Sequence, residues 1–238
     1  LPFEETFFRE HGIAAQYVGH PAKDHIDITY SKNEFCRTFG LSPGKPVLGL
    51  LPGSRKQEVN KLLPRMTASA LRLKSLIPGL QIVLCRVKSL EKKEFSHIRS
   101  RIDDICVIPG FSHDVMKHSD ALLVASGTAT LEAAIVGTPM VVCYRISTLS
   151  YLIARLLIDV EMIGLVNIVA GRKIVPELIQ HRATEGAMTS HVYPLLTDSG
   201  LRKQMVSELQ KVSKKLGLPG SAGHTAEAVL SFLRDLKK

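Results

Sequence analysis

Several features that identify common classes of binding protein are missing from this sequence of 238 residues. Only 5% of the residues are aromatic and no RNP or zinc-finger pattern occurs, which makes nucleic acid the weakest candidate partner. The nine histidines show no His-Glu-x-x-His or similar spacing, so we expect no metal ion. The cysteines form no Cys-x-x-Cys pair and are expected to be reduced core residues of a cytosolic protein; they are Cys36, Cys85, Cys106 and Cys143.

Three signatures of phosphate binding or catalysis also fail. Residues 40–46 (GLSPGKP) miss both the spacing and the final Ser or Thr of a Walker A loop. No Gly-x-Gly-x-x-Gly follows a predicted strand, so a dinucleotide site is unsupported. Ser126 lies outside any Gly-x-Ser-x-Gly elbow, which makes it better suited to binding a ligand than to nucleophilic attack.

An uninterrupted apolar run that could span a membrane is lacking as well. The longest apolar stretch, residues 149–169, contains Arg155, Asp159 and Glu161, so we expect two buried helices there. The alternative is that residues 151–157 contact a lipid surface or acyl chains. No signal peptide is visible at the start, and a first residue other than methionine predicts a fragment or processed product.

What the sequence does contain is positive charge and a regular apolar pattern. The formal net charge of +9 favours acidic partners such as nucleotides or anionic lipids. A hydrophobic content of 45% over 238 residues is enough for one large α/β domain or two small ones. Between residues 47 and 143 the pattern alternates strand and helix, which predicts a parallel sheet with helices on both faces. The strands are expected near Val47, Gln81, Cys106, Leu122 and Met140, and the helices near Lys61, Glu94, Asp114 and Leu131.

The flanks of this region are predicted to be mostly helical. Before it, we expect a helix at residues 3–10, a short strand at 14–18 and a helix at 31–39. After it, helices are expected near Leu152, Val175 and Ala187, and at residues 203–216 and 222–236. The last two helices have no strand to follow, so we expect them to pack on a part of the protein outside this chain.

The most informative segment runs from Leu50 to Glu58 (LLPGSRKQE). An apolar strand ends there, Gly53 and Ser54 form a turn, and an amphipathic helix follows. The first N–H groups of a helix have no intrahelical partner and favour an anion. Arg55 adds a planar fork that suits phosphate oxygens. The alternative is that Ser54 only caps the helix while the two basic side chains at 55 and 56 point into water.

A second junction of the same type follows the strand near Leu122. Ser126, Gly127 and Thr128 form the turn, and the helix that follows carries Glu132 in its first turns. A carboxylate there stabilises the helix dipole by about 0.3–1 kcal/mol without any ligand. The alternative is that Glu132 accepts hydrogen bonds from the vicinal hydroxyls of a sugar while the turn holds a phosphate. A nucleotide would supply both groups.

The two junctions are expected at the same carboxyl edge of the sheet, where open α/β sheets bind ligands. Asn167 and the block at residues 170–172 are further polar candidates, although each alone is an ordinary turn residue. Reasoning from the residues alone therefore reaches a metal-independent site for a nucleotide or nucleotide-sugar.

The same segments, in the same order, resemble those of lipid A disaccharide synthases, a family of bacterial glycosyltransferases. The resemblance covers essentially the whole chain. It is carried by residues 18–21 (VGHP), 50–58 (LLPGSRKQE), 125–132 (ASGTATLE), 137–142 (GTPMVV), 167–172 (NIVAGR) and 175–178 (VPEL).

The resemblance implies a fold and a domain organisation. The chain would be the α/β, Rossmann-like, UDP-binding lobe of a two-lobed GT-B enzyme, with a helical C-terminus. Residues 1–20 would form a lead-in segment and linker between the lobes, residues 21–200 the lobe that binds the nucleotide-sugar, and residues 201–238 helices that pack on the N-terminal lobe. Family members can also form homodimers through their C-terminal helices.

The resemblance also implies an activity. Such enzymes condense UDP-2,3-diacylglucosamine with 2,3-diacylglucosamine 1-phosphate, with inversion, to give the lipid A disaccharide 1-phosphate and UDP. They act without a metal or other cofactor, at the inner face of the bacterial inner membrane, as peripheral proteins.

Site residues follow from the same resemblance. Arg55 and Asn167 would be catalytic, although Val166 stands where the family usually has proline. The donor would be bound by Gly53, Ser54, Arg55, Ser126, Gly127, Thr128 and Glu132. The general base would lie in the N-terminal lobe, outside this chain. Two alternatives stay open: a UDP-binding module that is not catalytic on its own, and another UDP-sugar enzyme such as a 2-epimerase.

Overall fold

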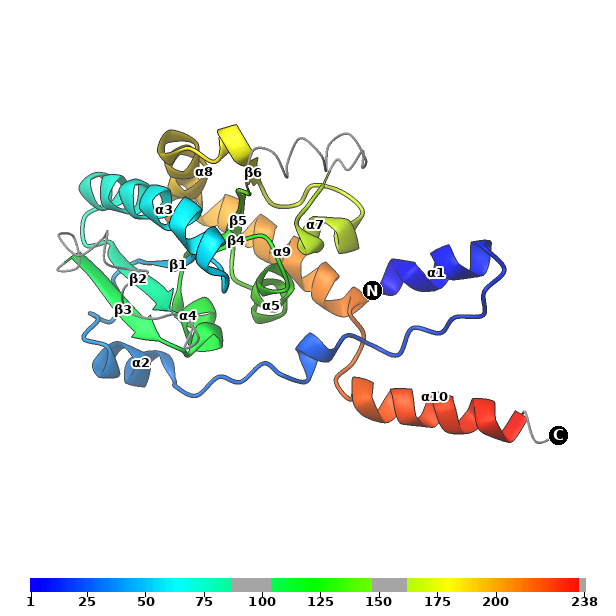
Figure 1. Cartoon of the computed structure of the whole chain (residues 1–238). Helices are drawn as coiled ribbons and strands as arrows, with labels where there is room; N and C mark the ends of the chain where they lie inside the picture. The colour runs from blue at the N-terminus through cyan, green and yellow to red at the C-terminus, as the bar shows by residue number, and fades with distance from the viewer. Residues whose placement is uncertain (87–103, 147–161, 236–238) are drawn as a thin grey trace.

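The fold is built on a six-stranded sheet in which every strand pair is parallel. The structure is a computed structural model that describes residues 1–86, 104–146 and 162–235. The strand order is β3-β2-β1-β4-β5-β6, so the direction of progression reverses between β1 and β4 (Figure 1). The strands are β1 (Val47–Leu51), β2 (Gln81–Arg86), β3 (Ile105–Pro109), β4 (Ala121–Ala125), β5 (Met140–Tyr144) and β6 (Glu177–Ile179). The predicted Rossmann-like parallel sheet is confirmed.

Helices cover both faces of this sheet, as expected for parallel strands joined by crossovers (Figure 1). One face carries α3 (Lys56–Leu76) and α8 (Glu185–Thr197), which pack against each other. The other face carries α2 (Lys32–Thr38), α4 (Ser112–His118), α5 (Ala129–Val136), α7 (Leu165–Ala170) and α9 (Ser199–Lys215). The remaining described elements are α1 (Pro2–Glu10), α10 (Ser221–Asp235) and the short 3-10 helices η1 (Pro21–Lys23) and η3 (Gln180–Arg182).

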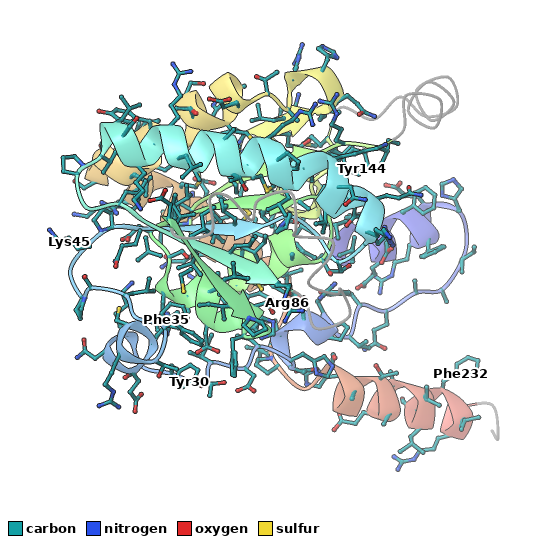
Figure 2. The ribbon with its side chains drawn as sticks, turned by 60° about the vertical axis from the view of Figure 1, so that its left-hand side comes forward. Tyr30, Phe35, Lys45, Arg86, Tyr144 and Phe232 are labelled. Carbon is teal, nitrogen blue, oxygen red and sulfur yellow. The ribbon has the colours of Figure 1, made fainter. Side chains whose placement is uncertain are left out.

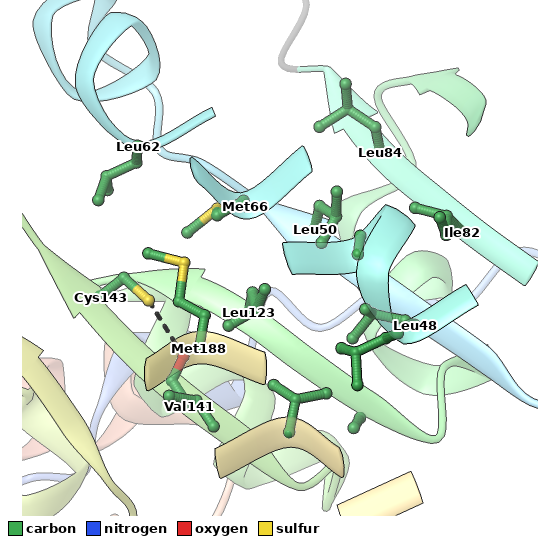
Figure 3. Close-up of a cluster of buried hydrophobic side chains, with 14 of the residues drawn as sticks. Leu48, Leu50, Leu62, Met66, Ile82, Leu84, Leu123, Val141, Cys143 and Met188 are labelled. Atoms are coloured by element: carbon green, nitrogen blue, oxygen red, sulfur yellow. Dashed lines mark hydrogen bonds between the residues drawn. The ribbon is translucent and has the colours of Figure 1, made fainter. Parts of the chain in front are cut away.

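The two hydrophobic layers follow from the alternation of side chains along each strand. In β1, Leu48 and Leu50 pack toward α3 and α8, whereas Val47 and Leu51 pack toward the opposite helices. All five residues of β1 are buried, because a central parallel strand is covered on both faces. Figure 3 shows part of the first layer, in which Met66 of α3 lies near Leu50 of β1, and Met188 of α8 lies beside Cys143 of β5.

The segment that precedes α2 is anchored along α4. Asp114 is almost fully buried, and its Oδ1 accepts hydrogen bonds from the amides of Thr29 (3.0 Å) and Tyr30 (2.8 Å). The ring of Tyr30 then packs edge-on against Phe39, with 5.7 Å between the ring centroids, and Figure 2 shows Phe35 on α2 with Tyr30 nearby. These contacts bring residues 27–30 alongside α4, next to the carboxyl edge of the sheet.

Four predicted elements differ from the structure or lie outside the described residues. Residues 14–18 are irregular rather than a strand; the amide of Tyr17 bonds to the Glu5 carboxylate at 2.7 Å instead of to a neighbouring strand. The helix expected near Val175 is wrong, because that segment leads into β6, the strand that pairs with β5 at the sheet edge. The helices expected near Glu94 and Leu152, and the possible lipid contact at residues 151–157, lie outside the described residues.

The C-terminal helices differ in how they are covered. α9 contacts α5, α7 and α8 and buries Leu209 and Val212, so it belongs to the layer on this sheet. α10 lies away from the sheet, with Phe232 64% exposed (Figures 1 and 2). Docking of residues 201–238 on an N-terminal lobe stays a prediction. Of the two C-terminal helices, α10 is the one whose apolar side chains are exposed. In the part of the chain that the structure describes, no helix is both long enough and apolar enough to cross a membrane.

The start of α10 is held by a residue from the other end of the chain. The carboxylate of Asp24 accepts hydrogen bonds from the amides of Gly220 and Ser221 and from the Ser221 hydroxyl. Beside this contact, the Tyr17 hydroxyl donates to the carbonyl of Leu216 at 3.1 Å. Asp24 therefore acts as an N-cap supplied from a distant segment.

We expect Asp24→Ala to loosen α10 without unfolding the sheet. The first amides of α10 lose their acceptor, so hydrogen exchange of residues 221–235 should accelerate several-fold while exchange in β1 and β4 stays unchanged. Glu10→Ala, which removes an exposed carboxylate at the end of α1, is the control. Unchanged exchange in α10 would show that Asp24 does not anchor it.

This anchor also has a defined pH dependence. The Ser221 hydroxyl, followed by the Gly220 amide, lowers the pKa of Asp24 below its ordinary value. A carboxyl group whose pKa is lowered by folding contributes stability above its unfolded pKa. The protection of α10 should therefore be lost as the pH falls through the lowered pKa of Asp24, and Asp24→Ala should remove that pH dependence.

Candidate functional site

A cavity of about 450 Å³ opens at the carboxyl edge of the sheet, where β1 and β4 lie side by side. This is the position at which the strand order reverses, so the loops after β1 and β4 run to opposite faces and leave a crevice between them. Every residue predicted to bind the donor lines it. They are Gly53, Ser54, Arg55, Ser126, Gly127, Thr128 and Glu132.

The loop after β1 is shaped by Gly53 and Glu58. Gly53 has a φ of +110°, a conformation that side chains disfavour, and a Cβ there would lie 2.3 Å from Oε2 of Glu58. Arg55, not Ser54, is the N-cap residue of α3, and no side chain caps this helix. Ser54 therefore does not cap the helix, whereas the other half of that alternative, basic side chains that point into water, agrees with the 83% exposure of the Arg55 side chain.

Arg55 stands at the mouth of the cavity with its side chain 83% exposed. Its Nη1 lies 3.2 Å from Oε1 of Glu58, one turn into α3. A guanidinium has five N–H donors, so this pairing leaves donors for an anion at the helix start. Sequence reasoning missed Glu58 as a lining residue; an acidic residue three positions after the N-cap, able to reach back over the first turn, was the available signal.

The loop after β4 is tied to the segment before α7. The Ser126 amide donates to the carbonyl of Cys143, and the Ser126 hydroxyl donates to the carbonyl of Ile163, both at 2.9 Å. Thr128 is the N-cap residue of α5 and is exposed. A Cβ on Gly127 would have no neighbour within 4 Å, although its φ of +155° is one that side chains rarely adopt. This open turn leaves room for a ligand to approach the backbone.

Glu132 supplies the carboxylate of the cavity wall. Its side chain is 26% exposed, and its Oε2 lies 3.5 Å from Nε2 of His113 on α4. The hydrogen bond with Glu132 raises the pKa of His113, against an opposing effect of burial. Glu132 is therefore held at the cavity from one side and open to a ligand on the other.

Cys85 also lines the cavity, from the end of β2. Burial, with the negative charge of Glu132 as a smaller cause, raises the pKa of Cys85 to about 12. The thiol is therefore neutral near pH 7 and is a poor nucleophile. Its place in the wall is that of a small apolar side chain.

Asn167 lies elsewhere, buried beneath the cavity wall. It is 0% exposed, and its amide nitrogen donates to the carbonyl of Val175 (3.0 Å) and to the Glu177 carboxylate (2.7 Å). Its oxygen accepts from the amides of Ile174 (2.8 Å) and Val175 (3.1 Å). These four bonds use every donor and acceptor site of the side chain. The geometry gives Asn167 a structural role, and the catalytic role expected from the sequence stays a prediction.

Asn167 is connected to the cavity wall through its hydrogen bond with Glu177. That carboxylate accepts hydrogen bonds from the amides of Ile163 (2.9 Å) and Gly164 (3.0 Å). The next residue, Leu165, lines the cavity. Asn167 and Glu177 therefore position the wall that faces the second turn. Arg172, from the block at residues 170–172, pairs instead with Glu208 of α9.

The chemistry of the cavity suits an anion that carries hydroxyl groups. Two helix starts and Arg55 favour negative charge, and Glu132 can accept hydrogen bonds from hydroxyls. Within residues 1–86, 104–146 and 162–235, no group of three or more His, Cys, Asp or Glu side chains could hold a metal ion.

Comparison with known families gives one consistent match. The family model described as lipid-A-disaccharide synthetase matches residues 1–226. A lipid-A-disaccharide synthase of Syntrophus aciditrophicus (strain SB) is 41% identical over 236 residues, which cover 98% of this chain and 62% of that protein. The lipid-A-disaccharide synthase of Myxococcus xanthus (strain DK1622) is 39% identical over 237 residues, with 98% and 61% covered. The chain thus spans about 61% of the length of such relatives.

Solved structures agree on the fold. The glycosyltransferase WaaG, involved in lipopolysaccharide biosynthesis, has a TM-score of 0.55 and 16% identity over 82% of this chain and 49% of that one. A putative UDP-N-acetylglucosamine 2-epimerase from Listeria monocytogenes has a TM-score of 0.61 and 15% identity, over 92% and 53% of the two chains. At such low identity these likenesses support the α/β fold of one lobe of a GT-B protein and do not separate transferase from epimerase.

Proposed function

The chain belongs to the lipid-A-disaccharide synthetase family, and from that membership we propose that it forms the donor-binding lobe of an inverting glycosyltransferase. The enzyme condenses UDP-2,3-diacylglucosamine with 2,3-diacylglucosamine 1-phosphate. The acceptor hydroxyl oxygen bonds to the anomeric carbon, the bond from that carbon to the diphosphate oxygen breaks, and its electron pair leaves with UDP. The hydroxyl proton goes to a general base.

One observation carries this proposal: both turns, Arg55 and Glu132 meet in a single cavity. In our assignment the diphosphate lies at the starts of α3 and α5, where the positive ends of the helix dipoles favour it. Arg55 stabilises the charge that develops on the leaving diphosphate. Glu132 accepts hydrogen bonds from the ribose hydroxyls, and Gly53, Ser54, Ser126, Gly127 and Thr128 shape the two turns.

We assign the general base, and the greater part of the acceptor site, to the portion of the enzyme that this chain does not contain. The chain matches only part of its relatives, and Asn167 has no free group to offer. The proposed reaction uses no metal and no other cofactor, because helix starts and Arg55 neutralise the leaving group.

The proposed location is the cytoplasm, with peripheral binding to the inner face of the bacterial inner membrane, where both acylated substrates reside. The net charge of +9 supports association with an anionic surface. A homodimer, and docking of α10 on the N-terminal lobe, are further proposals of the same kind.

The first test is calorimetric titration of the chain with UDP, with ADP as the comparison ligand. We expect selective UDP binding, weakened by about tenfold or more in Glu132→Ala, because hydrogen bonds to a charged group contribute about 1.5–3 kcal/mol. Glu208→Ala is the matched control. Glu208 is a carboxylate on α9 that pairs with Arg172 and Lys211, and it does not line the cavity. Equal affinities for UDP and ADP, or no UDP binding, would contradict the proposal.

The same titration does not separate an enzyme from a binding module, but substrate turnover does. Joined to the N-terminal part that its relatives possess, the chain should form the disaccharide and release UDP. Conversion of UDP-N-acetylglucosamine to its C2 epimer, with no disaccharide formed from the diacylated donor, would favour the 2-epimerase alternative.

A further inference from the structure

We propose that His113 is a positioning residue that orients Glu132 and so makes the cavity selective for ribonucleoside diphosphates over their 2′-deoxy forms. The inference rests on the proposed function, because it assigns Glu132 to the ribose. His113 is the second residue of α4, and Glu132 lies on α5, which packs against α4. His113 itself was not among the residues expected from the sequence to form the site.

The hydrogen bonds of His113 define which ring nitrogen carries the proton. The backbone amide of Asp27 lies 3.1 Å from Nδ1. An amide N–H can only donate, so Nδ1 must accept and the proton of the neutral ring lies on Nε2. Nε2 is the atom that faces Oε2 of Glu132 at 3.5 Å. The ring therefore presents an N–H to the carboxylate.

In metal sites, a hydrogen-bond partner behind a ligand fixes the orientation of that ligand. Here His113 plays the part of the partner, and the Glu132 carboxylate is the group that is oriented. Glu132 has a flexible side chain, and its free rotamers must be lost when a ligand binds. A donor that holds Oε2 reduces that loss and leaves Oε1 and the remaining lone pairs for hydroxyl groups. His113 is itself restrained, with its side chain 19% exposed.

A purely structural role, as an anchor for residues 27–30, is the competing account. That segment has a second and stronger anchor, because the buried carboxylate of Asp114 accepts from the amides of Thr29 and Tyr30. Loss of the Asp27 contact should therefore leave the segment in place. The contact with Glu132 has no such duplicate in the hydrogen bonds and ion pairs of the described residues.

Two substitutions separate the contact that Nδ1 of His113 makes with Asp27 from the contact that Nε2 makes with Glu132. His113→Asn keeps an oxygen near the position of Nδ1, where it can accept from Asp27, but its amide is too short to reach Glu132. His113→Gln extends an N–H near the position of Nε2 and can donate to Glu132, while it lacks the acceptor for Asp27. The anchoring role and the positioning role therefore predict opposite behaviour for the two variants.

The experiment is calorimetric titration of the unchanged chain and both variants with UDP and with 2′-deoxy-UDP. We expect the unchanged chain to prefer UDP, and His113→Asn to lose about tenfold in UDP affinity with at most a twofold change for 2′-deoxy-UDP. His113→Gln should retain most of the preference. The thermal midpoint of each variant shows that it is folded.

The outcomes distinguish this inference from the function on which it rests. Binding of UDP by the unchanged chain, with the same preference in His113→Asn, would overturn the positioning role alone. Loss of preference in His113→Gln but not in His113→Asn would overturn it in favour of the anchoring role. Failure of the unchanged chain to bind UDP would overturn both this inference and the proposed function.

Discussion

Replacement of Arg55 with alanine, in the enzyme that joins this chain to the N-terminal part of its relatives, should lower turnover by about 10²-fold or more. In the proposed reaction, the leaving diphosphate gains negative charge as the bond to the sugar breaks. Arg55 lies at the start of α3, where the amides and the helix dipole already favour an anion. Its contribution should therefore be larger in the transition state than in the bound donor.

The kinetic pattern identifies this role. A group that acts only in the transition state lowers kcat and kcat/KM together and leaves KM nearly unchanged. Arg55→Lys keeps the charge but loses the planar fork, so we expect an intermediate loss. Arg172→Ala is the matched control, because Arg172 is also exposed and paired with a carboxylate but lies outside the cavity lining. A loss below about threefold in Arg55→Ala would rule out stabilisation of the leaving group.

Glu58 makes this test informative about the loop as well. Its carboxylate bonds to Arg55 and covers Gly53. If that pairing orients the guanidinium toward the cavity, Glu58→Gln should keep a weaker hydrogen bond to Arg55. Its loss of turnover should then be smaller than that of Arg55→Ala. The spatial relation of Glu58 to Gly53 also explains why the turn requires glycine at that position.

Replacement of Asn167 with alanine should destabilise the folded chain strongly, by about 3 kcal/mol or more. The side chain is fully buried and makes four hydrogen bonds. Its removal leaves the Val175 carbonyl, two amides and the Glu177 carboxylate without those partners. Each buried polar group that loses its partner costs about 1–3 kcal/mol.

Thermal unfolding measures this effect. For a chain of this size a loss of about 3 kcal/mol corresponds to a midpoint lower by about 6–12 °C. Arg172→Ala, five residues along the chain in an exposed ion pair, should shift the midpoint by little, because exposed pairs contribute about 0–1 kcal/mol. A drop below about 2 °C in Asn167→Ala would contradict the structural role and would reopen a direct role at the ligand.

Sequence reasoning succeeded where a signal repeats along the chain. The strands near Val47, Gln81, Cys106, Leu122 and Met140 are apolar on both faces, and all are present in the sheet. Such runs are buried because helices cover both sides of a parallel sheet. The two strand-turn-helix junctions followed from the same pattern.

It failed where an element is short or depends on a distant partner. β6 has three residues, too few to show a period, and it forms only because β5 offers an open edge. Residues 14–18 have strand-like composition but no neighbouring strand, and the Tyr17 amide finds Glu5 instead. The composition of a segment shows that it can form a strand, but it forms one only where a neighbouring strand is available for pairing.

The sequence by itself determined the parallel sheet, the two anion-favouring turns and the membership of a family, because each depends on local pattern or on the order of short motifs. Only the tertiary structure decided that both turns open into one cavity, that the Asn167 side chain is buried and bonded to the segment before β6, and that His113 reaches Glu132. Those relations join residues far apart along the chain, such as Asp27 and His113. Their distances are set by how helices pack on the sheet, which no local pattern encodes.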